Sequence, residues 1–484
     1  MLLNTFTYVC FLAVTAAVHW LLPEKYRNRF LILVSVLFLY FNGMGSLTVA
    51  VLTTVFGFVF GRLIEKETVQ KKRRTLLIAG IVLLTGSLSF FKYAALWNSF
   101  LKKPISVIFP VGISFYTFET IGYLADVYLG KTGAERDPVD WALAVLFYPQ
   151  VLSGPIARFE RIMPQVKHRT VDEKIVGEGL RRFLSGSMCK IALADGLAII
   201  VDGIYNNMDA HSGLAITAAA FLYPIQLYFD FSGYSSMAVG SAMLFGFRLQ
   251  ENFLAPYFST GMGEIWRRWH ITLSEWFRDY IYFPMGGSRK GERRTLLNLF
   301  TVFAVSALWH GNSWSNLIWG AVIVISRFLE RIFDRKTEMG DPHSLKNWLK
   351  RAGVYVWWTM TLVPFRMETV PDIFMMLHRQ LEKPHLAGFV GEILNLAANR
   401  ISATGTYYLI FFGSLAVGFA IECWKDYRLY FSATEKGSVP DTDPIASLSE
   451  KKRWALYWIM GLITAAMYII TQTGGGPSFI YQGY

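Results

Sequence analysis

Long apolar runs, separated by short charged clusters, dominate this sequence of 484 residues. Hydrophobic residues make up 53% of the chain and charged residues only 17%, whereas about a quarter of a typical soluble domain is charged. Many of the runs are long enough to cross a hydrocarbon core about 30 Å thick. The pattern therefore predicts an all-α fold, a polytopic transmembrane helical bundle of about ten to twelve membrane-embedded helices.

Candidate membrane-embedded segments are distributed along the whole chain. They lie at 5–22, 30–42, 47–63, 75–96, 105–129, 139–157, 190–204, 213–230, 234–247, 295–310, 313–331, 352–366, 405–423 and 453–471, and several of them are too short or too broken to cross the membrane on their own. Two segments separate the basic loops 24–29 and 62–74, so the positive-inside rule places both loops in the cytoplasm and the N-terminus outside. The first charges follow the first apolar run, which is the wrong order for a cleavable signal peptide.

We expect one membrane domain over residues 1–484. It would consist of N-terminal spans (1–104), a catalytic core (105–330) and C-terminal spans with an aromatic tail (331–484). Proline and glycine interrupt the apolar runs at 110–112, 153–155 and 311–313. Broken backbone at membrane depth is tolerated where protein buries it or where it lines a cavity. The core is therefore expected to surround a central funnel.

The charge and the cysteines exclude two other classes of protein. The net charge of +12 comes from basic residues at the ends of apolar runs, which the positive-inside rule explains without nucleic acid. Cys10, Cys189 and Cys423 are too far apart to form a disulfide framework or a zinc site. The sequence also lacks H-E-x-x-H, P-loop and G-x-S-x-G motifs.

Residues 262–281 form an amphipathic pattern that differs from the apolar runs. Tryptophans and other apolar residues recur every three or four positions and charged residues take the other positions. This spacing predicts one helix lying in or near the membrane interface. His270 falls at the border of its apolar stripe, on the flank shared with Arg267 and Ser274, where it can face a polar cavity.

His310 is the strongest candidate for chemistry. It ends an apolar run that begins beside the basic cluster 289–294, and a helix would place it about 20 to 25 Å from that cluster, within the membrane. An ionisable residue at this depth is a functional candidate. A neutral imidazole suits a general base that deprotonates a hydroxyl. A structural hydrogen bond between helices is the alternative.

Two further polar stripes point toward the same region of the chain. Each combines a carboxylate with a tyrosine on one helical face; the stripes are Glu119, Tyr123 and Asp126, and Gln226, Asp230 and Tyr234. Structural hydrogen bonding between spans is the simpler interpretation of both, because a carboxylate in the bilayer needs partners. A metal site at His270 and His310 would need a third ligand, which the sequence does not offer, so no metal is predicted.

Five motifs in this order resemble the membrane-bound O-acyltransferase (MBOAT) family, in its AlgI-like polysaccharide O-acetyltransferase branch, which is related to DltB. They are F-P-V-G-I-S-F-Y from Phe109, Y-P-Q-V-L-S-G-P-I from Tyr148, Y-F-D-F-S-G-Y-S-S-M from Tyr228, W-R-R-W-H-I-T-L-S from Trp266 and L-W-H-G from Leu308. The resemblance implies a ring of spans around a central funnel. It also implies that His310 and His270 are the two catalytic histidines.

The resemblance further implies an enzyme that transfers an acyl group, in the first instance acetyl, to hydroxyls of an extracytoplasmic polysaccharide. The donor would be acetyl-CoA or an acyl-carrier-protein thioester, with no bound cofactor. The location would be the bacterial cytoplasmic (inner) membrane, and an extracytoplasmic protein would complete delivery to the polymer. Candidate lining residues of the cavity are Asp230, Gln226, Tyr234, Glu119, Trp309, Arg267 and Ser274.

The aromatic tail 477–484 resembles an aromatic C-terminal ending seen in this family. The resemblance implies that Tyr481 could accept the acyl group as a phenolic ester and pass it on. The alternative is that the tail is an aromatic anchor at the membrane interface. Two other functions stay open at this point, D-alanyl transfer to teichoic acid and transport of a polysaccharide or lipid without chemistry. Lipid-linked glycosyl transfer would require an acidic metal-binding motif in a loop near the first span, but the loop there, 24–29, is basic.

Overall fold

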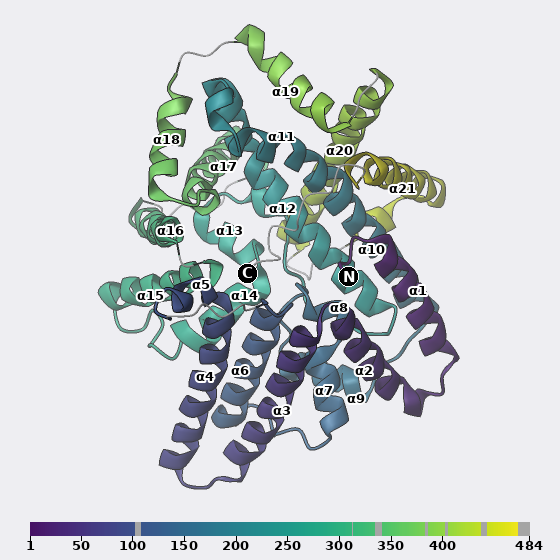
Figure 1. Cartoon of the computed structure of the whole chain (residues 1–484), viewed down its shortest axis with the longest axis vertical. Coiled ribbons are helices and arrows are strands. Elements are labelled where there is room, and N and C mark those ends of the chain that lie inside the picture. Colours follow the sequence, from purple (N-terminus) through teal and green to yellow (C-terminus); the bar gives the residue numbers. More distant parts are fainter. Residues whose placement is uncertain are drawn as a thin grey trace. The chain divides into compact units, whose positions relative to one another are not determined.

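The computed structural model describes residues 1–101, 108–311, 313–333, 341–382, 386–401, 405–436 and 443–472. Within these ranges the regular structure consists of α-, 3₁₀- and π-helices and includes no strand (Figure 1). The all-α prediction is therefore confirmed for the described chain. Its helices divide into two compact units.

The first unit contains Met1–Phe183 and Tyr234–Glu251. Its first four long helices follow the first four predicted spans. The helices are α1 (Phe6–Leu21), α2 (Glu24–Phe41), α3 (Met44–Lys66), α4 (Gln70–Lys92), α5 (Ala94–Asn98), α6 (Ile113–Leu129), α7 (Pro138–Leu146), α8 (Tyr148–Val151) and α9 (Phe159–Lys167).

The second unit contains the described parts of Leu184–Gly233 and Asn252–Ile480. Two helices belong partly to each unit, α10 (Glu173–Ser187) and α12 (Gly213–Met243). The others are the π-helix η1 (Met188–Ala194), α11 (Asp195–Tyr205), η2 (Met208–Ala210), η3 (Pro256–Phe258), α13 (Met262–Arg268), α14 (Ile271–Phe277), the π-helix η4 (Arg278–Tyr282), α15 (Glu292–His310), α16 (Trp314–Phe333), α17 (Leu345–Arg366), α18 (Val370–Gln380), α19 (Leu386–Ile401), α20 (Gly405–Lys436), η5 (Pro444–Ser447) and α21 (Glu450–Gln472).

Six helices of the described chain are long and apolar enough to cross a membrane. They are Met44–Lys66, Gln70–Lys92, Glu173–Tyr205, Gly213–Met243, Gly405–Phe431 and Glu450–Thr471. The chain is thus a multi-pass membrane protein, as expected, while the predicted total of about ten to twelve embedded helices stays a prediction.

Several predicted boundaries are wrong. Segments 213–230 and 234–247 are one continuous helix, α12, and segment 190–204 is the second half of a helix that begins at Glu173. α12 continues through the predicted break because Gly233 packs closely against a neighbouring helix. A Cβ at Gly233 would lie 2.7 Å from the Lys190 backbone nitrogen, so this glycine admits a neighbouring helix and does not end its own. Segment 139–157 is also not a single helix, because α7 ends at Leu146.

Small residues bring α3 and α6 together in the first unit, where the two helices run side by side (Figure 1). A Cβ at Gly57 would lie 2.6 Å from Thr120 Cγ2, and one at Gly61 would lie 2.6 Å from the Tyr123 ring. Glycine at these positions lets the helix backbones approach, which is the usual device of membrane helix pairs. This packing fixes the polar stripe of α6.

Candidate active site

His310 is the last residue of α15. The Gly311 N–H makes the last helical hydrogen bond, to the Ala307 carbonyl at 3.1 Å, and the helix ends because the backbone of Gly311 is extended. A Cβ at Gly311 would lie only 2.5 Å from Asn316 Nδ2 of α16. A larger residue after the histidine would require the Asn316 amide to move. The L-W-H-G motif is thus a helix end that presents an imidazole.

Aromatic rings surround His310, whose side chain is almost completely buried. The centroid of its ring lies 4.6 Å from that of Trp309 and 5.1 Å from those of Trp319 and Phe365. Trp319 and Phe365 meet the imidazole edge-on, at interplanar angles of 85° and 80°. Such a desolvated setting strengthens the electrostatic and hydrogen-bonding interactions that a substrate makes there.

His270 lies between α13 and α14 with a left-handed backbone, at φ 42° and ψ 54°. It is one of two non-glycine residues with positive φ in the described chain. Neither ring nitrogen has a hydrogen-bond partner among the described residues, although the side chain is only 2% exposed. Burial lowers the pKa of the imidazole to about 3, which keeps the ring neutral and able to donate one N–H.

The predicted continuous helix over 262–281 is wrong at this position. The Asn252 carbonyl accepts from the Ile271 N–H at 2.9 Å, and the Leu254 N–H donates to the Arg268 carbonyl at 3.0 Å. These long-range bonds take the place of helical ones, so α13 ends at Arg268 and α14 begins at Ile271. The strained conformation at His270 is held by its neighbours, as is common at functional sites.

Trp309 connects the two histidines. Its ring centroid lies 4.6 Å from that of His310 and 6.2 Å from that of His270. Phe231 of α12 packs edge-on against His270 at 4.6 Å. The second unit thus brings together both histidines, from segments forty residues apart in the chain, around one indole.

Asp230 forms an ion-paired cluster that the sequence analysis did not identify. Lys190 Nζ lies 2.6 Å from Asp230 Oδ1 and 2.6 Å from Asp195 Oδ1. The three side chains are 1 to 3% exposed. Lys190 belongs to the π-helix η1, a distortion that is frequent at functional sites. A lysine at the start of a predicted apolar segment was the signal that could have identified it.

The Y-F-D-F-S-G motif of α12 is a junction of the second unit. The Tyr228 hydroxyl donates to Asp426 Oδ2 at 2.9 Å, while Asp230 binds Lys190 and Phe231 contacts His270. Gln226 is buried on the same helix, and its Oε1 has no partner among the described residues. The motif therefore connects α20 and η1 to the environment of His270.

The remaining lining candidates fall in different places. Glu119 belongs to the first unit, where its Oε1 accepts from Gln150 Nε2 at 2.6 Å and from the Ala157 N–H at 2.9 Å. Tyr234 also belongs to that unit, and its hydroxyl accepts from the Leu3 N–H at 3.4 Å. Their assignment to the cavity stays a prediction, and their contacts are those of structural residues. Tyr481 lies outside the described residues.

Arg267 lines a pocket of about 260 Å³ that α13 and α16 enclose, together with Arg327, Glu264 and Glu330. Arg327 pairs with Glu330, whose carboxylate accepts the Gly263 N–H at 3.0 Å. Arg267 is exposed. Ser274, in contrast, is turned back toward the chain, with its Oγ 3.4 Å from the Trp269 carbonyl oxygen. The predicted central funnel stays a prediction, because neither His310 nor His270 lines this pocket or the pocket at the end of α11 that is described below.

Comparison with known proteins supports a functional interpretation of this arrangement. Residues 137–365, which include both histidines and Asp230, match the membrane-bound O-acyltransferase (MBOAT) family. The chain is 38% identical to the probable alginate O-acetylase AlgI of Pseudomonas putida over 330 residues, covering 66% of this chain and 68% of the relative. It is 31% identical to the peptidoglycan O-acetyltransferase of Helicobacter pylori, covering 64% of this chain and 66% of the relative.

A more distant similarity, 26% identity, links it to the teichoic acid D-alanyltransferase of Streptococcus thermophilus, covering 53% of this chain and 67% of the relative. For the alginate-related proteins, the matched segment spans 63 to 68% of their own length. Both histidines lie inside the range 137–365 that matches the family model. The chain therefore belongs to the membrane-bound O-acyltransferase family.

Proposed function

We propose that this protein is an O-acyltransferase of the bacterial cytoplasmic membrane. It moves an acyl group, in the first instance acetyl, from a cytoplasmic thioester to hydroxyls of an extracytoplasmic polysaccharide. The observation that supports this most directly is the convergence of His310 and His270 on Trp309 within the segment that matches the family. The similarity to alginate and peptidoglycan O-acetylating relatives favours acetyl as the group and a polysaccharide as the acceptor.

In the proposed reaction His310 acts as general base. Its ring nitrogen takes the proton of the acceptor hydroxyl as the oxygen attacks the thioester carbonyl. The tetrahedral intermediate collapses, the new ester C–O bond remains, the C–S bond breaks, and the thiolate leaves with the proton from the imidazolium. Because aromatic rings leave the His310 side chain only 7% exposed, few water molecules can reach the imidazole, which would disfavour hydrolysis of the donor.

His270 is proposed to stabilise the oxyanion. It is neutral, buried and without a partner among the described residues, so one N–H is free to donate to the carbonyl oxygen as charge develops there. The left-handed backbone orients the ring before substrate arrives, which avoids reorganisation during the reaction.

On the donor side, Arg267 at its pocket and the basic cluster 289–294 at the start of α15 offer positive charge to an anionic donor. That donor is either acetyl-CoA or a carrier-protein thioester. Tyr481 relays the acyl group in one version of the proposal, and an extracytoplasmic partner protein completes delivery in both.

Substitution of His270 tests its role separately from its backbone. His270→Gly removes the imidazole N–H, and glycine adopts the left-handed conformation at this position without strain. We expect the turnover number per mole of folded protein to fall about a hundredfold, the typical effect of losing one oxyanion donor. Ser274→Ala, four residues away, is the control and should stay near wild type. Full activity in His270→Gly would contradict the assignment.

Reconstitution tests the function itself. Purified protein in liposomes is given radiolabelled acetyl-CoA, or a radiolabelled acetyl or D-alanyl carrier protein, and a polysaccharide acceptor. We expect labelled ester on the polymer with an acetyl donor. Ester formed only from the D-alanyl carrier would replace acetyl transfer with the teichoic acid reaction. Polymer movement across the bilayer without any labelled product would identify a transporter and end the proposal.

A further inference from the structure

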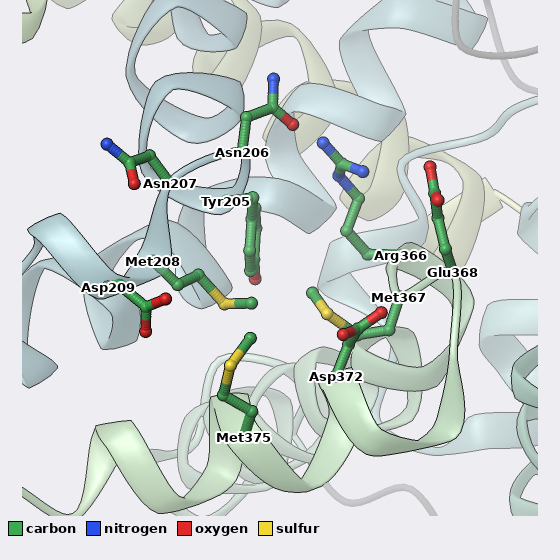
Figure 2. A pocket seen from close by; sticks show the side chains of 10 residues that line it. All are labelled: Tyr205, Asn206, Asn207, Met208, Asp209, Arg366, Met367, Glu368, Asp372 and Met375. Carbon is green, nitrogen blue, oxygen red and sulfur yellow. The ribbon is translucent and has the colours of Figure 1, made fainter.

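A second pocket, of about 320 Å³, lies in the second unit between the end of α11 and the α17–α18 connection (Figure 2). Figure 2 shows the Tyr205 hydroxyl and the thioether ends of Met208, Met367 and Met375 directed toward its middle. Asp209, Glu368 and Asp372 also line it. The volume suits a side chain or a small ligand, and it combines an apolar floor with an acidic rim.

Tyr205 places a phenolic hydroxyl in this pocket. Its side chain is only 8% exposed, and its hydroxyl makes no hydrogen bond to a described residue, so it is available to a ligand. The Arg366 guanidinium lies over the Tyr205 ring at 5.4 Å, and the Tyr223 ring meets it at a steep angle at 6.2 Å. A ligand in the pocket therefore meets the phenolic oxygen and the carboxylates.

The charge of the pocket favours a cation. The lining contains three carboxylates and one guanidinium, that of Arg366, which already lies 3.2 Å from Asp202 outside the lining. The lining thus has three negative charges and one positive charge, a net charge of −2. A protonated amine or guanidinium on an aliphatic stem fits both the carboxylates and the methionines. A uronate sugar would be repelled.

The walls of the pocket are held in place. Arg379 of α18 donates to the carbonyls of Asp209 and His211, at 3.3 and 2.8 Å, and pairs with Glu382 at 2.7 Å. Asp372 forms a capping box with Thr369 at the start of α18. The loop 206–212 and α18 are therefore joined before any ligand binds, which lowers the entropic cost of binding.

The positive-inside rule places this pocket outside the cytoplasm. Residues 191–247 contain no lysine or arginine, whereas basic residues occur in both flanking stretches, 158–190 and 248–268. The loop 206–212 connects two helices that are long enough to span the membrane, Glu173–Tyr205 and Gly213–Met243. The basic residues lie near the far ends of these helices, so those ends are cytoplasmic and the loop lies on the other side of the membrane. The pocket also adjoins the candidate active site, because Phe365, which contacts His310 at 5.1 Å, directly precedes Arg366.

We propose that this pocket binds a lysine or arginine side chain of an extracytoplasmic protein that docks beside the active site. The inference rests on the proposed function for the identity of that protein as the acceptor-side partner. The selectivity of the acidic pocket for a basic side chain does not depend on the proposed function, because it follows from the residues that line the pocket. The occupied pocket would hold the partner within one residue of the aromatic cage of His310.

A peptide-binding experiment tests this selectivity. The full chain in nanodiscs of zwitterionic lipid is titrated with fluorescein-labelled tetralysine, tetraglutamate and an oligouronate, and fluorescence anisotropy is measured. We expect saturable binding of tetralysine only. The double variant Asp209→Asn/Glu368→Gln should bind it about tenfold more weakly, since each exposed ion pair contributes modestly. Glu450→Gln, an exposed acid at the start of α21, should bind as wild type does.

If the double variant Asp209→Asn/Glu368→Gln folds poorly, a variant with reversed charge at position 368 still tests the proposal. Glu368→Lys should lose tetralysine and gain tetraglutamate binding. Equal affinity of wild type and the double variant for tetralysine, or preference of wild type for the oligouronate, would overturn the proposal. Competition by n-butylamine at the affinity of tetralysine would identify a site for free amines instead of a docking site.

Acyl transfer is measured in the same preparations. The double variant should keep the wild-type rate toward a soluble acceptor, because neither residue belongs to the catalytic site. Failure of wild type to transfer any acyl group would refute the proposed function while leaving the peptide result valid.

Discussion

Replacing His310 with asparagine is expected to lower acyl transfer by about 10²- to 10⁴-fold, the usual contribution of general acid–base catalysis. Asparagine keeps a polar side chain that can donate a hydrogen bond at the end of α15, but it cannot accept a proton at neutral pH. The aromatic cage of Trp309, Trp319 and Phe365 therefore still has a polar side chain at its centre. The rate of ester formation is measured per mole of folded protein in proteoliposomes.

The matched control is His19, another fully buried histidine, which lies in the first unit. Its ring meets Phe245 edge-on at 5.2 Å and has no hydrogen-bond partner among the described residues. His19→Asn should change stability but not the rate per folded molecule. A rate loss shared by both variants would mean that burial, and not proton transfer, explains the effect. Wild-type turnover in His310→Asn would remove the general base from the mechanism.

Replacing Lys190 with methionine is expected to destabilise the second unit by about 3 to 5 kcal/mol, the typical cost of removing one partner from a buried ion pair. The ammonium group lies 2.6 Å from both Asp195 and Asp230, and methionine would remove this buried positive charge from between the two carboxylates. The midpoint of thermal unfolding, followed by fluorescence-detected size-exclusion chromatography in detergent, reports the loss.

A triple variant, Lys190→Met with Asp195→Asn and Asp230→Asn, separates charge from shape. It removes all three charges at nearly constant volume, so it should recover a substantial part of the stability lost in the single variant. Equal instability of the single and triple variants would show that the lysine acts through packing, and the ion-pair explanation would fail. Lys451→Met, an exposed lysine near the start of α21, is the control and should leave the unfolding midpoint unchanged.

The amino-acid sequence was sufficient to predict the helices and the main candidate residue. In a membrane no water is available to bond the backbone N–H and C=O groups, so an apolar run of membrane length must form a helix. The all-helical class and the helices α1–α4 could therefore be predicted from composition and periodicity. His310 could be singled out because an ionisable residue at the end of an apolar run is costly and is followed by a glycine that ends the helix. The catalytic roles of His310 and His270 stay predictions.

Long-range contacts decided the rest. The amphipathic pattern of 262–281 predicts one helix, but hydrogen bonds to Asn252 and Leu254 break it at His270 and set its left-handed backbone. Periodicity reports only which faces are apolar, and it carries no information on which distant backbone group will compete for a hydrogen bond. Lys190 was overlooked for the same reason, because its partner Asp230 lies forty residues away and only the packing of η1 against α12 brings them together.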